Sequence, residues 1–518
     1  MEMNKVFKDG LWSKEINVSD FVYTNITPYE GDASFLAGPT ERTKKVWNEC
    51  LKALEEERAN NGVRSLDNVT VSTITSHKAG YIDRENELIV GLQTDELLRR
   101  AIKPYGGIKV VEKACHENGV EVDEKVKDIF THYRKTHNDG VFDAYTEEIR
   151  SFRSLGFLTG LPDNYARGRI IGDYRRLALY GIDRLIEAKQ EDLRNITSPM
   201  TDARIRLREE VAEQIKALKE IKILGEYYGL DLSRPATNAQ EAVQWVYMAY
   251  LAAVKEQDGA AMSLGNVSSF LDIYIQYDLD HGKIDESFAQ ELVDQFIIKL
   301  RMVRHLRMQS YNDIFAGDPT WVTESIGGRF NDGRTKVTKT SFRFLQTLYN
   351  LGPSPEPNMT VLWSPELPEG FKEFCAQVSI DTSSIQYEND TLMREVRNCD
   401  DYGIACCVSY QAIGKQIQFF GARCNLAKAL LLAINGGRCE NTGTVMVKDI
   451  PVLTGDLLNF EEVWSNYKKV LMQIARVYND AMNIIHYMHD KYYYEKAQMA
   501  FIDTCLLYTS PSPRDSTS

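Results

Sequence analysis

Two cysteines stand side by side in Asp401–Ser409, which reads Asp-Tyr-Gly-Ile-Ala-Cys-Cys-Val-Ser and places thiols at Cys406 and Cys407. Neighbouring side chains on a short extended segment diverge, so a tetrahedral metal site or an ordinary long-loop disulfide is awkward there. Transfer of a hydrogen atom or an acyl group between the two sulfurs remains possible. The alternative interpretation is that both thiols pack as small hydrophobic side chains, since Cys is among the most buried residue types.

Further motifs are spread along most of the chain. They are Thr27–Asp32, Ser72–His77, Arg167–Arg176, Ser325–Gly328, Gly352–Met359, Lys415–Asn425 and His486–Asp490. Together with Cys-Cys-Val-Ser they resemble, in the same order, the pyruvate formate-lyase family, also called formate C-acetyltransferase. Related glycyl radical enzymes, such as diol dehydratases, carry one cysteine at this place, so the adjacent pair favours the pyruvate formate-lyase branch.

The resemblance implies a reaction in which pyruvate and coenzyme A become acetyl-CoA and formate through thiyl radicals. Cys406 would add to pyruvate C2 and carry the acetyl group as a thioester, and Cys407 would exchange a hydrogen atom with a radical glycine. The implied cofactor is that glycyl radical, with coenzyme A as co-substrate and no metal. The implied partners are a radical S-adenosylmethionine activating enzyme and a second copy of the chain in a homodimer.

Two arginines match the family's substrate positions, Arg169 and Arg423. A guanidinium fork holds a carboxylate with two hydrogen bonds and keeps its charge when buried. Because Arg423 follows the apolar run Phe419–Ala422, we expect that run to desolvate it beside the cysteines. The alternative for either arginine is a solvated position on the surface.

The resemblance also implies a wall around the substrate, formed by Trp321, Phe315, Phe420 and Ala261. Phe420 would pack on the substrate methyl group, and plain core packing is the alternative role for each aromatic side chain. No residue for coenzyme A can be placed from the sequence.

The resemblance covers residues 1–504, the cysteine-bearing part of the family's catalytic barrel. The Arg-Val-Ser-Gly-Tyr type of segment that stores the radical is missing, and Gly80-Tyr81 lacks that context. Residues 505–518 form a Ser/Pro-rich tail with two prolines that cannot continue a helix, so we expect a foreign tail in place of the glycine radical domain. The chain as written is then expected to be an inactive fragment.

Other functions stay open at this stage. A 2-ketobutyrate formate-lyase would differ mainly in the room around the substrate methyl group, which the motifs do not resolve. A non-catalytic fragment, or a helical scaffold outside the family, are the alternatives from other functional classes.

The composition is that of a large globular protein. The 518 residues are 43% hydrophobic and 26% charged, with a net charge of −13 that argues against nucleic acid or an anionic membrane as partner. No apolar run approaches the ~18 residues of a membrane span. Nine cysteines with no secretory signal and no C-x-x-C spacing indicate reduced thiols and a cytoplasmic location.

Hydrophobic periodicity predicts helices over 203–224 and 286–307, and a helix over 426–434 that ends before Gly436-Gly437. The longest predicted helix begins after Asn459 and covers most of the stretch to Ala500. Residues 360–363 and 404–408 are strand or loop candidates, and their alternation with helices favours an α/β fold. The resemblance implies a ten-stranded barrel of two five-stranded half-sheets with surrounding helices. That barrel would be incomplete here, with the cysteine loop at its centre.

Overall fold

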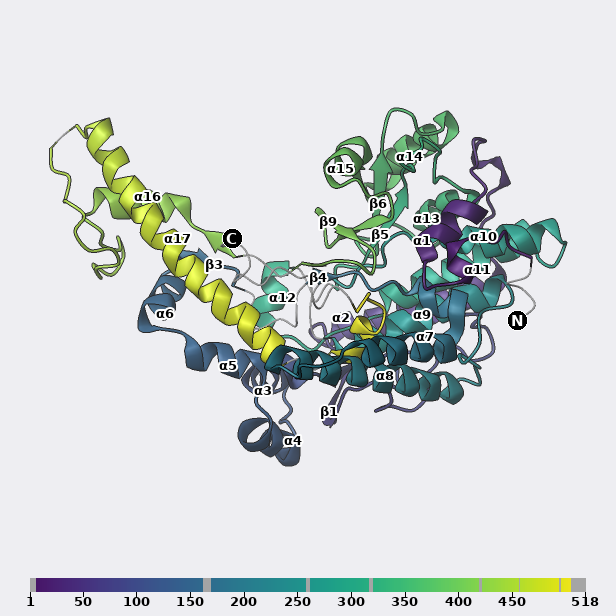
Figure 1. Cartoon of the computed structure of the whole chain (residues 1–518), viewed down its shortest axis with the longest axis horizontal. Helices are drawn as coiled ribbons and strands as arrows, with labels where there is room; N and C mark the ends of the chain where they lie inside the picture. Colours follow the sequence, from purple (N-terminus) through teal and green to yellow (C-terminus); the bar gives the residue numbers. More distant parts are fainter. Residues whose placement is uncertain are drawn as a thin grey trace.

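The computed structural model describes residues 6–161, 169–257, 261–315, 320–418, 422–455, 457–492 and 495–504 (Figure 1). Its helices are α1 (Val18–Asn25), α2 (Glu41–Ala59), α3 (Ile108–Glu117), α4 (Glu124–Asp128), α5 (His137–Ala144), α6 (Glu147–Ser154), α7 (Arg175–Asn195), α8 (Asp202–Tyr227), α9 (Ala239–Glu256), α10 (Ser268–Asp280), α11 (Glu286–Arg301), α12 (Gln309–Phe315), α13 (Lys339–Asn350), α14 (Glu369–Thr382), α15 (Asp390–Arg397), α16 (Leu426–Ile434), α17 (Phe460–Lys491) and α18 (Lys496–Met499). Its strands are β1 (Ser65–Val71), β2 (Arg99–Ile102), β3 (Leu158–Thr159), β4 (Arg169–Ile170), β5 (Thr323–Gly327), β6 (Asn358–Trp363), β7 (Ile385–Asn389), β8 (Tyr402–Ala405), β9 (Ser409–Ala412), β10 (Ile417–Gln418) and β11 (Arg423–Cys424).

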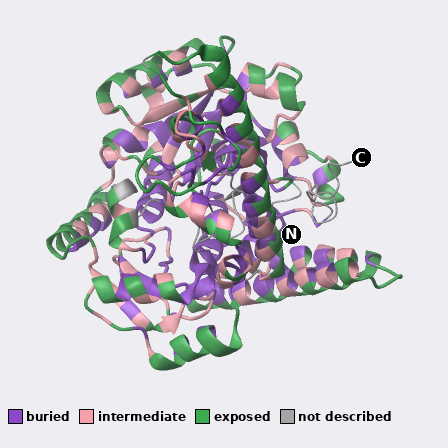
Figure 2. Cartoon of the chain, turned by 90° about the vertical axis from the view of Figure 1, so that its left-hand side faces the viewer, coloured by how far each residue is buried: buried purple, intermediate pink, exposed green. Residues whose placement is uncertain are grey.

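A helical body surrounds α9, which is buried along almost its whole length. A helix with apolar residues on every side belongs in the centre of a core, and α7, α8, α10 and α11 pack around this one. Figure 2 shows the buried interior of this body, with exposed residues on its projecting parts.

The described strands form small sheets beside this body. β5, β6 and β7 make a parallel sheet in that order, and β8 and β9 make an antiparallel hairpin. Three further sheets have two strands each and pair β1 with β2, β4 with β10, and β3 with β11. The α/β class predicted from the sequence is therefore confirmed, and the strands stand in short sheets of which β5–β7 is the widest described.

A second hydrophobic core lies under α17, the long helix that runs outward from the body with α16 beside its far end (Figure 1). It joins apolar residues of α5, α6, α16 and α17 with those of β3. β11 packs against the same cluster through Cys424, so the strand that carries Arg423 belongs to this second core.

One predicted helix ends earlier than expected, whereas α16 spans the predicted 426–434. α11 stops at Arg301 instead of 307, because the backbone N–H of Arg304 donates to Gln93 Oε1 at 3.0 Å and leaves the helical path. α17 begins directly after Asn459 and ends at Lys491, so it covers most of the stretch predicted for it. Beyond it, the N–H groups of Lys496 and Ala497 bind a carboxylate oxygen of α9, which turns the chain back onto the body.

No helix among the described residues is long and apolar enough to cross a membrane. The tail at 505–518 lies outside the described residues.

Candidate active site

The two cysteines occupy the tip of the β8–β9 hairpin. Ala405 pairs with Ser409, so Cys406, Cys407 and Val408 form the turn between the strands. Of the segment 404–408, predicted as strand or loop, Ile404 and Ala405 therefore belong to β8 and the remaining three residues form the turn. Cys406 is 8% exposed whereas Cys407 is exposed, which gives the two adjacent thiols different surroundings.

Hydroxyl groups from two other segments hold the backbone of this hairpin. Ser325 Oγ accepts the N–H of Ile404 at 2.8 Å, and Thr323 Oγ1 donates to the carbonyl oxygen of Cys406. Alternate residues of a strand point to the same side, so these two β5 side chains face the hairpin together. Ser263 Oγ accepts the N–H of Cys406 at 3.1 Å.

Ser263 belongs to a loop, residues 261–265, that runs beside β5. The N–H of Ala261 donates to the carbonyl oxygen of Thr320 at 2.9 Å, and the N–H of Ser325 donates to that of Gly265 at 2.7 Å. These backbone bonds at both ends of the loop fix the position of the Ser263 hydroxyl.

Three predicted site residues share a rare backbone conformation. Ala261, Trp321 and Cys406 have φ values of 70°, 47° and 64°, in the left-handed region that strains residues other than glycine. The Ser263 hydroxyl links two of them, because it accepts from Cys406 and lies 3.5 Å from the carbonyl oxygen of Trp321. Strained backbone of this kind persists where the surrounding structure enforces it, and it concentrates at functional sites.

Close backbone approach explains a glycine in the hairpin. A Cβ atom on Gly403 would lie 2.6 Å from the Cα atom of Gly265, closer than real Cβ contacts allow. Only glycine at this position lets β8 lie directly on the loop at 261–265.

A buried ion pair anchors the base of the hairpin. Arg175 donates to both carboxylate oxygens of Asp401 at 3.0 and 2.9 Å, and to Asp173 at 2.7 Å. Burial alone would raise the pKa of Asp401, but the Arg175 guanidinium outweighs it and holds this pKa below its ordinary value. Asp401 therefore stays ionised and ties the start of β8 to α7.

The sequence model of one family, described as pyruvate formate lyase-like, matches residues 11–510. The chain belongs to this family. A curated relative from Haemophilus influenzae named formate acetyltransferase is 56% identical over 511 residues, which are 97% of this chain and 66% of the relative. The chain thus spans just under two thirds of that relative's length.

Solved structures of more distant proteins show the same fold. The B12-independent glycerol dehydratase of Clostridium butyricum aligns with a TM-score of 0.74 at 20% identity, covering 93% of this chain and 68% of its own. A glycyl radical enzyme of Archaeoglobus fulgidus aligns with a TM-score of 0.67 at 18% identity, covering 91% and 66%. The predicted family and the predicted glycyl radical enzyme fold are confirmed.

The structure brings four of the predicted site residues into one connected region of this family member. Cys406, Cys407, Ala261 and half-buried Trp321 are joined through the hairpin, the loop at 261–265 and the start of β5. Phe420 lies outside the described residues, and so does the side chain of Phe315 at the end of α12.

The two predicted substrate arginines lie on separate two-residue strands, Arg169 on β4 and Arg423 on β11. Arg169 pairs with Gln418 across β4 and β10, although its side chain lies outside the described part. Arg423 pairs with Thr159 across β11 and β3, and its side chain is exposed. The expectation of a desolvated Arg423 was wrong for the described structure, because β11 is a two-residue strand at the surface of the second core.

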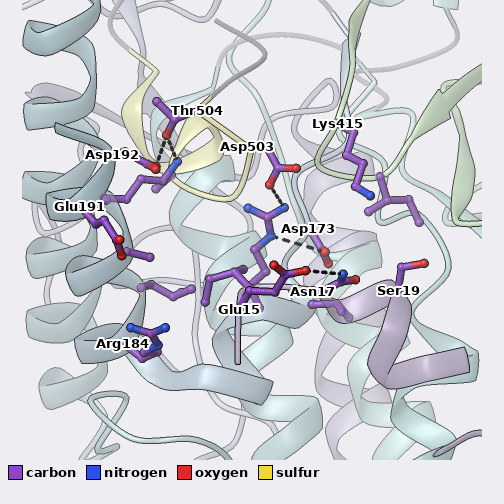
Figure 3. A pocket seen from close by; sticks show the side chains of 18 of the residues that line it. Glu15, Asn17, Ser19, Asp173, Arg184, Glu191, Asp192, Lys415, Asp503 and Thr504 are labelled. Atoms are coloured by element: carbon purple, nitrogen blue, oxygen red, sulfur yellow. Dashed lines mark hydrogen bonds and ion pairs between the residues drawn. The ribbon is translucent and has the colours of Figure 1, made fainter. Parts of the chain in front are cut away.

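A cavity of about 570 Å³ opens at the base of the hairpin (Figure 3), and neither Cys406 nor Cys407 lines it. Its walls are residues 14–19, part of α7, the hairpin-base residues Asp401, Ile413 and Lys415, and Ala500, Asp503 and Thr504. Lys189 donates to Thr504 Oγ1 at 2.9 Å, and burial lowers the pKa of Lys189 to about 8. The last described residues therefore form part of the cavity wall.

The structure adds two site residues that were not predicted from the sequence, Ser263 and Thr323. It also gives a contact to Ser325 and to Arg175, which lie in the motifs Ser325–Gly328 and Arg167–Arg176 but had no role assigned. The alternation of two hydroxyl residues just before Gly327-Gly328 is a signal that could have located Thr323 and Ser325. No group of three or more His, Cys, Asp or Glu side chains in the described ranges could hold a metal ion.

Proposed function

We propose that this chain is the substrate-binding, cysteine-bearing part of a formate acetyltransferase, which converts pyruvate and coenzyme A to acetyl-CoA and formate. The observation that carries the proposal is the pair of adjacent thiols at the hairpin tip, one buried and one exposed, in a pyruvate formate lyase-like chain. The 56% identity to a formate acetyltransferase supports the same activity.

The two thiols have different tasks in this proposal. The glycyl radical of the complete enzyme would accept one hydrogen atom. Cys407, exposed at the turn, gives up that hydrogen atom and then takes another from the thiol of Cys406. Cys407 must be accessible to the radical glycine, and its thiol is exposed. Cys406 must be shielded from solvent while it carries a radical, and it is 8% exposed.

Cys406 then acts on the substrate. Its sulfur radical adds to C2 of pyruvate, and the C1–C2 bond breaks homolytically. The acetyl group remains on Cys406 as a thioester, and C1 leaves as the carbon dioxide radical anion. This radical takes a hydrogen atom from the thiol of Cys407 and becomes formate, and the resulting Cys407 radical recovers a hydrogen atom from the glycine. Exchange of this thioester with the coenzyme A thiol is nearly isoenergetic, so the activated acyl bond is conserved.

Arg169 and Arg423 bind the pyruvate carboxylate in this proposal, and Trp321, Ala261, Phe315 and Phe420 enclose the substrate. The complete protein is a cytoplasmic homodimer that a radical S-adenosylmethionine enzyme activates in the absence of oxygen.

A fusion protein tests this function. Residues 1–504 are joined to the part of the Haemophilus influenzae relative that has no counterpart here, and the fusion is activated anaerobically. We expect a glycyl radical signal and pyruvate-dependent acetyl-CoA formation from the activated fusion, and a fusion with the radical signal but no acetyl-CoA formation would contradict the proposed function.

Cysteine variants of the same fusion sharpen the test. Cys406→Ser and Cys407→Ser should each abolish product formation. Cys50→Ala is the matched control, since burial raises the pKa of the Cys50 thiol to about 12 and makes it unreactive. Full activity in either of the first two variants would contradict the proposed roles.

A further inference from the structure

Glu324 lies between the two β5 residues that hold the cysteine hairpin, and its side chain points to the opposite side of the strand. The residue is fully buried, and Oε1 accepts the N–H groups of Val267 and Ser268 at 2.9 and 2.8 Å. We propose that Glu324 is a positioning residue for Cys406, acting through the loop at 261–268. This inference rests on the function proposed above.

The bonds of this loop form a continuous path from Glu324 to the thiol. Gly265 pairs with Glu324 as a parallel bridge, and the N–H of Leu264 donates to the carbonyl oxygen of Thr323 at 2.9 Å. Ser263 is the next residue along, and its hydroxyl accepts the N–H of Cys406. Release of the loop at Val267 and Ser268 would therefore loosen the support of Cys406.

The carboxyl group of Glu324 suits this task in its neutral form. Its second oxygen, Oε2, is buried without a hydrogen-bond partner among the described residues, and a full charge there would be costly. Burial raises the pKa of Glu324 to about 8, although the N–H groups of Ser268 and Val267 and the charge of Arg175 act in the opposite direction.

Arg175 is the charged group that acts on the carboxyl group of Glu324 from α7. Its charge is shared with Asp173 and Asp401. The β6 residue paired with Glu324 is the uncharged Met359. On α10, which begins at Ser268, the first charged residue is Asp272, and that carboxylate accepts the N–H of Thr340 at 2.9 Å and lies 3.7 Å from Arg343.

Alkylation of the thiols in the full chain tests this role without requiring catalysis. Iodoacetamide labelling of Cys406 is measured relative to exposed Cys407 by peptide mass spectrometry. Glu324→Ala removes the acceptor of two buried N–H groups, so the Cys406 to Cys407 labelling ratio should rise about tenfold through local opening. Glu324→Gln keeps the shape and the acceptor oxygen, so its ratio at neutral pH should equal that of the wild type.

A helix cap elsewhere provides the matched control. Asp285 accepts the N–H of Phe288 at 2.8 Å at the start of α11 and has no described contact with the hairpin. Asp285→Ala should leave the Cys406 to Cys407 ratio unchanged. An equal rise in this variant would mean general loosening and would overturn the positioning role.

The Cys406 to Cys407 labelling ratio is also compared between wild type and Glu324→Gln at a series of pH values. A purely structural role for Glu324 would produce no pH-dependent difference between the two proteins. The two ratios should coincide below about pH 7 and separate above about pH 8, where only the wild type gains a buried charge. Coincidence at every pH, or labelling of Glu324→Gln that matches Glu324→Ala, would overturn the inference. An inactive fusion protein with these labelling shifts intact would reject the proposed function alone.

Discussion

The cysteine hairpin and the β3–β11 ribbon each carry residues expected at one substrate site, but the rest of the molecule supports them differently. Hydroxyl groups of the loop at 261–265 and of β5 bind the hairpin backbone, and a buried ion pair anchors its base. The ribbon has two residues in each strand, and Arg423 is exposed on it.

The two regions are held in place by different parts of the molecule. Cys406 is held by bonds that reach across 83 and 143 positions of the chain, whereas the ribbon is tied to the second core, for instance by the N–H of Ala422 to Tyr478 Oη at 3.1 Å. The main body thus holds the backbone of Cys406, whereas Arg423, the cation proposed to bind the substrate carboxylate, lies on a surface strand that the second core supports.

Loss of the ion pair under the hairpin should have the largest effect on stability. Arg175→Gln removes the guanidinium that binds both carboxylate oxygens of the partly buried Asp401, and leaves buried Asp173 with Arg176 at 3.5 Å. The free energy of unfolding should therefore fall by ~3 kcal/mol in urea titrations. Arg334→Gln is the control, because its ion pair with Asp332 is exposed and should contribute at most ~1 kcal/mol. Equal effects of the two variants would remove the contrast between the regions.

The close approach of β8 to the loop at 261–265 should be the next most sensitive feature. Gly403→Ala forces the Cα atom of Gly265 away and should cost ~2–3 kcal/mol of unfolding free energy, measured by urea denaturation. Gly38→Ala is the matched control, since a Cβ there meets nothing within 4 Å and should change stability little. A neutral Gly403→Ala would show that the hairpin can shift without cost.

The single hydroxyl that joins the loop to the hairpin should have a smaller effect. Ser263→Ala leaves the N–H of Cys406 without its acceptor, so we expect a loss of ~1–2 kcal/mol and faster alkylation of Cys406. Ser269→Ala removes a comparable buried bond, to the carbonyl oxygen of Lys336 at 2.9 Å, and should leave the alkylation rate unchanged. Identical alkylation in both variants would refute the specific link.

The ribbon should respond least in stability. Arg423→Gln should change the unfolding free energy by less than ~0.5 kcal/mol, because the side chain is exposed. In the active fusion protein the same variant should raise the KM for pyruvate about tenfold or more, through loss of hydrogen bonds to the carboxylate. Arg438→Gln, another exposed arginine, should alter neither quantity.

Local patterns of the sequence determined several elements correctly. The adjacent thiols were visible directly, the apolar stripe over 203–224 lies within α8, and residues 426–434 form α16 as predicted. Hydrophobic periodicity reports which face of one helix is buried, and this information is contained in neighbouring residues. The order of the motifs also identified the family, which the comparison with the family model confirmed.

Only the tertiary structure decided how the site is assembled. The left-handed backbone of Ala261, Trp321 and Cys406 arises from bonds between segments far apart in sequence, which no local pattern encodes. The end of α17 at Lys491 depends on a carboxylate of α9, and the exposure of Arg423 depends on where β3 lies. Side-chain types and short-range periodicity therefore determined the chemistry and many of the elements, whereas long-range hydrogen bonds and close backbone contacts placed them.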